Sequence, residues 1–176
     1  MDLAADATLA FPRALVFSTY RDHLLDVVEY LPNIRAIEVK SRKEDGPLVD
    51  LLNVWHGGGD IPAAARAFIS EAMLSWDDQA RWDERDFTCH WKIVTHSFTE
   101  AVRCEGTNRY LERDGQTTLQ IRGTLSIDPS KVRGVPRLLA GSVGRAVEDF
   151  LGKKIQPNLV EVSVGVRRYL EAKAKG

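Results

Sequence analysis

Two glutamates and a group of aromatic side chains are the residues of this sequence whose types and spacing could support chemistry. Glu84 and Glu100 fall in segments whose pattern predicts β-strands, at positions expected to face inward. A carboxyl group buried among apolar side chains has a raised pKa and can act as a general acid or base. Because no nucleophile or cofactor motif accompanies the pair, the sequence favours a second interpretation, in which an arginine neutralises one carboxylate and the other lies at a solvated rim.

Three of the four tryptophans lie in the stretch SWDDQARWDERDFTCHW, residues 75–91. If the chain forms a hairpin that bends near residues 86–87, Trp82 lies directly across from Trp91. Both indoles then face the same side of the sheet, together with Trp55 from the preceding strand. Tryptophans commonly fill cores, so a solid core and a cavity wall are both open interpretations of this arrangement.

Polar residues share the expected inward positions with these indoles. They are Glu84, Glu100, Asn53, Asn108 and Tyr110. A dry core rarely accepts so many polar groups, whereas a roomy and partly wet cavity does. We therefore predict a ligand cavity. Its expected walls are Trp55, Trp82, Trp91, Phe98, Tyr110, Leu119 and Phe150, and its expected polar contacts are Glu84, Glu100 and Asn108.

Alternating polar and apolar residues predict an antiparallel sheet over most of the chain. Two-residue turn signals occur at Asp45–Gly46 and at Asp114–Gly115. Pairing around the second turn puts Tyr110 opposite Leu119 and leaves one face of the sheet polar and the other covered. Near the N-terminus, residues 3–10 predict a first strand, and the helical spacing that follows predicts two short helices.

The C-terminal segment is predicted to form the helix that covers the sheet. Apolar residues recur there mostly in steps of three and four from Val143 to Leu170, which predicts one long helix with a single apolar stripe. Pro157 lies inside the stripe without shifting its phase, so we expect a kink rather than an end. A further helix is predicted at residues 61–73, either as a lid over one mouth of the cavity or as a plain connection.

The segments FPRALVFSTYRDHLLDVVEYLPNIRAIEV and VEDFLGKKIQPNLVEVSVGVRRYL, together with the order of the predicted elements, resemble START-like proteins. This superfamily, also called SRPBCC, includes polyketide cyclases, ubiquinone-binding chaperones and pollen-allergen ligand carriers. The resemblance covers essentially the whole chain and implies an α+β helix-grip fold, in which a curved antiparallel sheet wraps around a long kinked C-terminal helix. It also implies a lipid, a polyketide-like ring system or an isoprenoid as the bound molecule.

The composition bounds the class of protein. The 176 residues are 44% hydrophobic and 28% charged with a net charge of −1, which is ordinary for one soluble globular domain over residues 1–176. A near-neutral chain lacks the basic excess with which proteins grip nucleic acid. The sequence shows no signal peptide and no apolar run long enough to cross a membrane, and its two cysteines, Cys89 and Cys104, predict reduced thiols in the cytoplasm.

Several short motifs resemble known catalytic or metal-binding sites but lack the residues that such sites require. HGGG at residues 56–59 and AGSVG at residues 140–144 are similar to parts of a lipase, but no histidine follows His96, so the required order of catalytic residues is missing. The four histidines show no spacing that fixes a metal, and no phosphate or dinucleotide motif indicates a cofactor, so we expect neither. Cys89 and Cys104 would lie across from each other if the next bend falls directly after His96.

We therefore predict a protein that binds an apolar or amphipathic small molecule, for transport or sequestration, between the sheet and the C-terminal helix. Two alternatives stay open. One is an enzyme of the cyclase or dehydratase type that uses the carboxylates of Glu84 and Glu100 in the same cavity. The other is a pocketless module that recruits another protein. The sequence leaves the identity of the ligand and the oligomeric state open.

Overall fold

The computed structural model describes residues 1–58, 74–96, 100–131 and 159–175. In these residues, seven strands form one antiparallel sheet in the order β1-β7-β6-β5-β4-β3-β2. The strands are β1 (Asp2–Leu9), β2 (Ile34–Asp45), β3 (Leu48–Gly57), β4 (Ser75–Asp83), β5 (Thr88–Thr95), β6 (Val102–Arg113) and β7 (Gln116–Ile127). Strands β2 to β7 follow chain order, and the N-terminal strand completes the sheet by pairing with β7.

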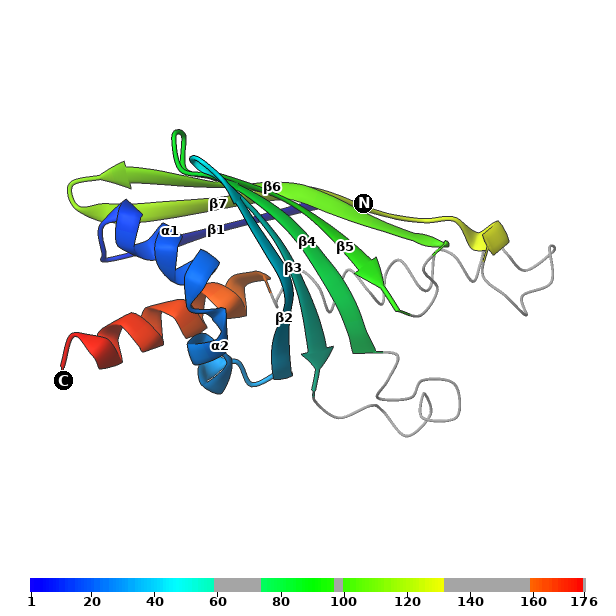
Figure 1. The fold of residues 1–176 in the computed structure, drawn as a ribbon, viewed down its shortest axis with the longest axis horizontal. Coiled ribbons are helices and arrows are strands. Elements are labelled where there is room, and N and C mark those ends of the chain that lie inside the picture. The colour runs from blue at the N-terminus through cyan, green and yellow to red at the C-terminus, as the bar shows by residue number, and fades with distance from the viewer. Residues whose placement is uncertain (59–73, 97–99, 132–158, 176) are drawn as a thin grey trace.

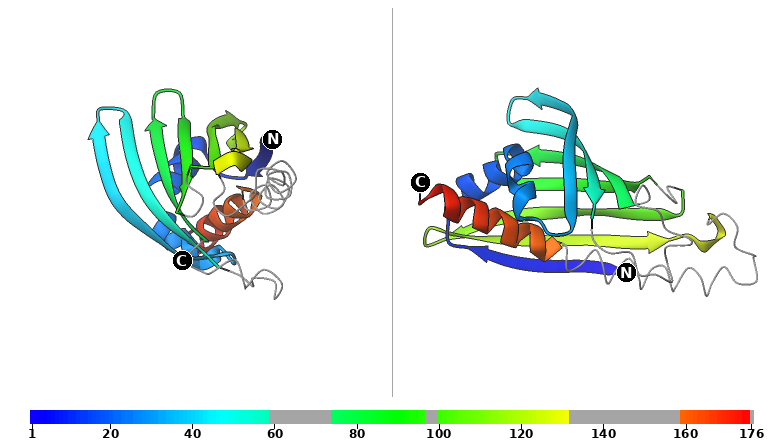
Figure 2. Two further views of the ribbon diagram at one scale, coloured as in Figure 1. Left: turned by 90° about the vertical axis from the view of Figure 1, so that its right-hand side faces the viewer. Right: turned by 90° about the horizontal axis from the view of Figure 1, so that it is seen from below.

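Helices cover one face of this sheet (Figure 1). They are α1 (Arg13–Asp22), α2 (Leu24–Val27) and a C-terminal helix (residues 159–173), and the 3-10 turns η1 (Val28–Tyr30) and η3 (Pro129–Lys131) complete the described helical elements. The sheet curves around the C-terminal helix (Figure 2). This is the predicted α+β helix-grip arrangement. The expected kink at Pro157 and the expected helix at residues 61–73 lie outside the described residues, and the single-domain organisation stays a prediction.

Burial alternates along the strands as the sequence pattern predicts. On β7, Leu119 and Leu125 are fully buried, whereas Arg122 between them is exposed. The turn before this strand is tight because Asp114 and Gly115 both adopt positive φ angles of 53° and 74°, the left-handed conformations that a two-residue hairpin requires. The turn therefore determines the register, and the predicted pairing across it is confirmed.

The predicted register of the β4–β5 hairpin is wrong by two residues. Trp82 pairs with Cys89 and Trp91 pairs with Ala80, so the two indoles are not directly opposite each other. The reversal is centred earlier than expected, and Phe87 completes it with a φ of 54°. Because side chains alternate with a period of two, a shift of two residues leaves both indoles on the predicted, covered face.

The two cysteines do not lie across from each other. Cys89 pairs with Asn108 on β6, and Cys104 pairs with Ile93 on β5. Both are buried free thiols. The two cysteines were expected to pair only if the chain turned directly after His96. The connection between β5 and β6 is longer than that turn, so the register of β6 against β5 differs by four residues.

The described part of the C-terminal helix is held against the α1–α2 region and the sheet. Val166 and Leu170 are buried, as the apolar stripe predicts. The Tyr20 hydroxyl on α1 donates a buried hydrogen bond of 2.8 Å to Ser163 Oγ, and the Tyr169 hydroxyl donates a partly buried hydrogen bond of 3.2 Å to Asp26 Oδ2. These contacts anchor the helix end where α1 and α2 meet it. Among the described helices, none combines the length and hydropathy that a membrane-spanning helix needs.

Candidate functional site

A group of polar and aromatic residues lies on the covered face of β3 and β4. Asn53 on β3 pairs with Asp78 on β4, and the neighbouring pair in the same ladder is Trp55 with Trp76. The two indoles stack with ring centroids 6.0 Å apart and planes 15° apart. Trp82 has the same parity on β4 and packs on Phe17 of α1, so this is the helix-covered face. We call Asn53, Trp55, Trp76 and Asp78 the interior polar cluster.

Asp78 is the unusual member of the interior polar cluster. Burial raises the pKa of its carboxyl group from 3.8 to about 6, and polar contacts with Trp55 and Asn53 oppose that rise only in part. The Trp55 Nε1–H is a polar neighbour of Asp78, but it forms no hydrogen bond of normal geometry with a described acceptor. Asp78 nevertheless keeps part of its surface accessible. Asp78 therefore combines a carboxyl group whose pKa is raised by burial with a partly accessible surface.

Asp78 and Trp76 were not among the residues expected in the site. The sequence contained the signal for Trp76 and Asp78, because each lies an even number of residues from Trp82 on the same strand. Trp82 was predicted to face the covered side, so both residues should face it too. The expected site was built around Trp82 and Trp91, so the inward positions of Trp76 and Asp78, which precede Trp82 on the same strand, were left out of it. Strand β4 begins at Ser75 and therefore includes both positions.

The raised pKa of Asp78 predicts a pH dependence of stability. The folded chain binds the proton of the Asp78 carboxyl group more tightly than the unfolded chain does. Protonation of Asp78 therefore stabilises the fold fully below about pH 4, and this stabilisation is lost as the pH rises through about 6. At about pH 7.5, Asp78→Asn should therefore raise the free energy of unfolding by about 2 kcal/mol, and at about pH 4 the difference should nearly vanish. Urea unfolding of both proteins at the two pH values measures it.

Asp77→Asn is the matched control for this experiment. Asp77 precedes Asp78 on β4, points to the opposite face, and pairs there with His96 at 2.6 Å. Both side chains are partly exposed, so the loss of this surface ion pair should change stability by no more than about 1 kcal/mol at either pH. A pH-independent effect of Asp78→Asn would contradict the burial of its carboxyl group.

Trp91 lies flat over a pair of glycines on the same covered face. Gly106 on β6 pairs with Trp91 on one side and with Gly123 on the other. The indole takes the space that side chains at both glycines would occupy. Its Nε1 donates a hydrogen bond of 2.9 Å to Asn108 Oδ1. Trp91 is therefore fixed in place, with Asn108 beside it as a half-buried polar neighbour.

Other predicted wall residues form a closed aromatic core beneath α1. Phe17 makes edge-to-face contacts with Trp82 and Tyr110, each with ring centroids 5.2 Å apart. Trp82, Tyr110 and Leu119 are at most 4% exposed. Burial raises the pKa of Tyr110 well above its usual value. This end of the interior is packed around Phe17, and the roles of Trp82, Tyr110 and Leu119 as ligand contacts stay predictions.

The two glutamates do not face the interior, and that expectation is wrong. Strand β4 ends before Glu84, which lies in the turn, half exposed and paired with the Arg21 guanidinium. Strand β6 begins only at Val102, so Glu100 precedes the alternating segment and is exposed. Their positions agree with the interpretation that the sequence favoured, in which an arginine neutralises one carboxylate and the other is solvated. Phe98 and Phe150 lie outside the described residues.

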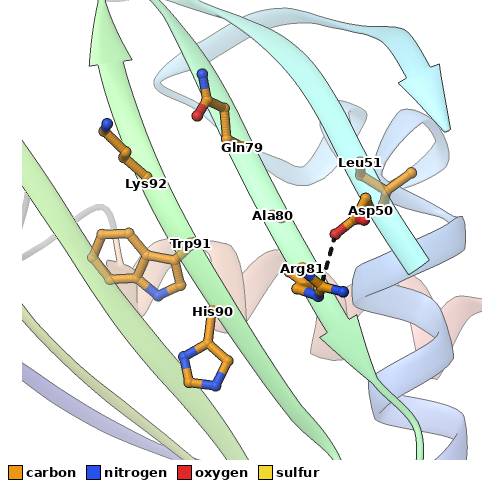
Figure 3. A pocket seen from close by; sticks show the side chains of 8 residues that line it. All are labelled: Asp50, Leu51, Gln79, Ala80, Arg81, His90, Trp91 and Lys92. Carbon is orange, nitrogen blue, oxygen red and sulfur yellow. Dashed lines mark ion pairs between the residues drawn. The ribbon is translucent and has the colours of Figure 1, made fainter. Parts of the chain in front are cut away.

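A shallow pocket of about 270 Å³ lies on the opposite, outer face of the sheet (Figure 3). Its lining residues are Asp50, Leu51, Gln79, Ala80, Arg81, His90, Trp91 and Lys92. The side chains of Gln79, Arg81, His90 and Lys92 alternate with buried residues, so they belong to the solvated face. Polar and charged side chains around an open depression do not suit an apolar ligand.

The histidines of the strands make contacts on the outer face. His56 Nδ1 lies 3.0 Å from Ser75 Oγ, and His56 Nε2 lies 3.0 Å from Glu38 Oε1. This order of partners is that of a serine hydrolase triad, but Ser75 is only 6% exposed, so its hydroxyl links strands and is not presented to a substrate. Within the described residues, no three His, Cys, Asp or Glu side chains are placed to hold a metal ion.

Comparison with known proteins identifies the fold. No protein-family model and no curated protein sequence matches the chain. The structure is similar to TTHA0849 from Thermus thermophilus, with a TM-score of 0.69 and 16% identity over 98% of this chain and 99% of that protein. It is also similar to the Zhui aromatase/cyclase from Streptomyces sp. R1128, with a TM-score of 0.62 and 16% identity over 99% of this chain and 93% of the other.

A third similar structure is Ara h 8.0201, with a TM-score of 0.58 and 16% identity over 94% of this chain and 97% of that chain. Likeness over nearly the full length of all three proteins takes in the curved sheet and the C-terminal helix together. It shows that the chain has the helix-grip fold of these proteins. At these identities the likeness concerns the fold alone.

Proposed function

We propose that this START-like helix-grip chain binds an apolar or amphipathic small molecule between its curved sheet and its C-terminal helix. The fold supports the proposal because the similar structures include the Zhui aromatase/cyclase. The chain itself supports this location, since stacked indoles and polar side chains meet on the helix-covered face.

One observation carries the proposal: Asp78 is surrounded by protein and still partly accessible. A solid core would leave no accessible surface on a residue at this depth, and it would not accept an unpaired carboxylate. Space beside Asp78 accounts for both properties. A space of this kind, with apolar walls and few polar groups, is the usual form of a small-molecule site.

The proposed contacts combine predicted residues with those found in the structure. They are Trp55, Trp91 and Asn108 from the prediction, and Asn53, Trp76 and Asp78 from the structure. The stacked indoles supply flat apolar surfaces, which suits a ring system or a lipid chain. Phe98 and Phe150 stay predicted contacts. The cytoplasmic location, the absence of a nucleic-acid partner and the choice among lipid, polyketide-like ring and isoprenoid also stay predictions.

A thermal-shift panel of fatty acids, isoprenoid alcohols and fused-ring aromatic compounds tests the proposal. A ligand that binds only the folded chain stabilises it by about 2.7 kcal/mol at a hundredfold excess over its dissociation constant. Trp55→Ala should weaken the affinity of a panel ligand by about tenfold or more, because it removes one apolar wall. His90→Ala is the control, since His90 lines the outer pocket and should leave affinity unchanged.

Two results would contradict this location and this function. Equal losses for Trp55→Ala and His90→Ala would place binding outside the interior polar cluster. A panel in which no compound raises the melting temperature would support the pocketless interaction module instead. Native mass spectrometry of freshly purified protein adds an independent measurement, because a bound interior ligand should copurify with the folded chain.

A second candidate function is an enzyme of the cyclase or dehydratase type. The positions of Glu84 and Glu100 give it no support, but a carboxyl group with a pKa of about 6 exchanges its proton near neutral pH, as an acid or base catalyst must. This candidate predicts that Asp78→Asn abolishes turnover of a polyketide-type substrate while neutral ligands still bind. Parallel loss of turnover and neutral-ligand binding would count against it.

A further inference from the structure

We infer that the interior polar cluster recognises the protonated amine of an amphipathic ligand, with Asp78 as its counter-charge and the stacked Trp55 and Trp76 indoles as an adjoining wall. This inference rests on the proposed function and adds the chemistry of the ligand's polar group. It concerns one end of the ligand, and the apolar remainder would extend along the covered face of the sheet.

The geometry places one carboxylate among neutral neighbours. Asp78 pairs with Asn53 on β3 and with Ile93 on β5, so its lateral neighbours in the sheet are an amide and an aliphatic side chain. The next ladder pair is the indole stack of Trp55 and Trp76. The cluster therefore contains one group that can carry charge and three side chains that cannot.

Among the described residues, no side chain brings a positive charge to the cluster. In the described part of the chain, no lysine, arginine or histidine forms an ion pair with Asp78, whereas Asp77 beside it on the outer face pairs with His96. The stabilising neighbours of Asp78 are the Asn53 amide and the Trp55 indole N–H, and that indole nitrogen, on a residue only 7% exposed, has no described hydrogen-bond acceptor. An unpaired buried carboxylate is unfavourable, and a ligand cation removes this cost.

The aromatic neighbours suit a cation with an apolar body. The face of an indole carries negative electrostatic potential and attracts ammonium groups, most strongly where water is excluded. A ligand carboxylate would instead be repelled by ionised Asp78, and a neutral hydroxyl would gain a hydrogen bond without relieving the unpaired charge. The expected order of affinity at neutral pH is therefore amine, then alcohol, then carboxylate.

Two series of probes with matched apolar bodies test this order. The first is 1-naphthylmethylamine, 1-naphthylmethanol and 1-naphthoic acid, and the second is dodecylamine, dodecanol and dodecanoic acid, each below its micelle concentration. Calorimetric titration of the full chain at about pH 7.5 should give the amine an affinity about tenfold or more above that of the alcohol in at least one series. The carboxylic acid should bind most weakly.

Asp78→Asn separates the charge from the shape of the site. The variant should lose the preference for the amine, keep its affinity for the alcohol within about twofold, and bind the acid more tightly than the parent does. The retained alcohol affinity shows that the variant is folded with its site intact. Asp77→Asn, which removes a carboxylate from the outer face one residue away, should leave all affinities unchanged.

The pH profile adds a readout that a purely structural role of Asp78 would not produce. The affinity of the parent protein for each amine should rise between about pH 5 and 7.5 as Asp78 ionises, and in Asp78→Asn it should be nearly flat. Cys89 and Tyr110 also interact electrostatically with Asp78, but burial raises the pKa of each well above its usual value, so both stay neutral over this range. Binding of both series without head-group preference, or an amine preference that survives in Asp78→Asn, overturns the inference and leaves the proposed function standing. Failure of all six probes and of the wider panel overturns both.

Discussion

Gly106→Ala should lower the free energy of unfolding by about 3 kcal/mol, the upper part of the range for overpacked sites. A methyl group at this position would overlap the Arg122 carbonyl oxygen and the Trp91 ring, and would lie 2.8 Å from the Gly123 Cα. Two of these three neighbours are main-chain atoms of the adjacent strand. Because main-chain atoms in a paired strand cannot turn away, β6 and β7 would have to separate. Urea denaturation of the variant measures the loss.

Gly165→Ala is the informative control for this prediction. A methyl group there would meet Leu31 Cδ2 at 2.5 Å, which is the far end of a flexible side chain. Alanine also favours a helix over glycine by about 1 kcal/mol, which offsets the cost of moving Leu31. We expect stability within about 1 kcal/mol of the parent protein. Equal effects of Gly106→Ala and Gly165→Ala would show that Trp91 does not lie across the glycine pair.

Phe17→Ala should cost about 3–5 kcal/mol, because it removes the ring that joins α1 to the sheet. Phe17 is 2% exposed, and its ring centroid lies 5.2 Å from each of the rings of Trp82, Phe87 and Tyr110. The cavity left behind would be lined by rigid aromatic side chains, which collapse poorly. Thermal and urea unfolding, followed by tryptophan fluorescence and circular dichroism, measure the loss.

Two further variants separate packing from ligand binding. Leu15→Ala on the exposed side of α1 changes the same helix without opening the core, and should alter stability by no more than about 0.5 kcal/mol. Phe17→Leu should keep the fold and leave the affinity for panel ligands unchanged, because Phe17 lies on α1 and its ring contacts are with Trp82, Phe87 and Tyr110, none of which belongs to the interior polar cluster. A loss of affinity comparable to that of Trp55→Ala would mean that the ligand space extends to α1.

The sequence by itself determined the elements whose signals are local. Strand alternation identified the covered face, and the Asp114–Gly115 turn set the β6–β7 register, because positive φ angles at two adjacent positions permit one hairpin geometry. The C-terminal apolar stripe predicted a covering helix, and in its described part, residues 159–173, Val166 and Leu170 are buried as expected. These features depend on neighbours within a few residues of one another, so a single sequence contains them.

Only the tertiary structure decided which polar residues enter the interior. Glu84 and Asp78 have the same parity on β4, but the strand ends before Glu84 and Arg21 from α1 pairs with it outside. Asp78 is flanked by β3 and β5 and lies on the face of the sheet that the helices cover. Strand ends and cross-strand partners depend on contacts between distant segments, and a period-two pattern is unchanged by a register shift of two residues. For that reason the sequence identified the face of the site but not the carboxyl group within it.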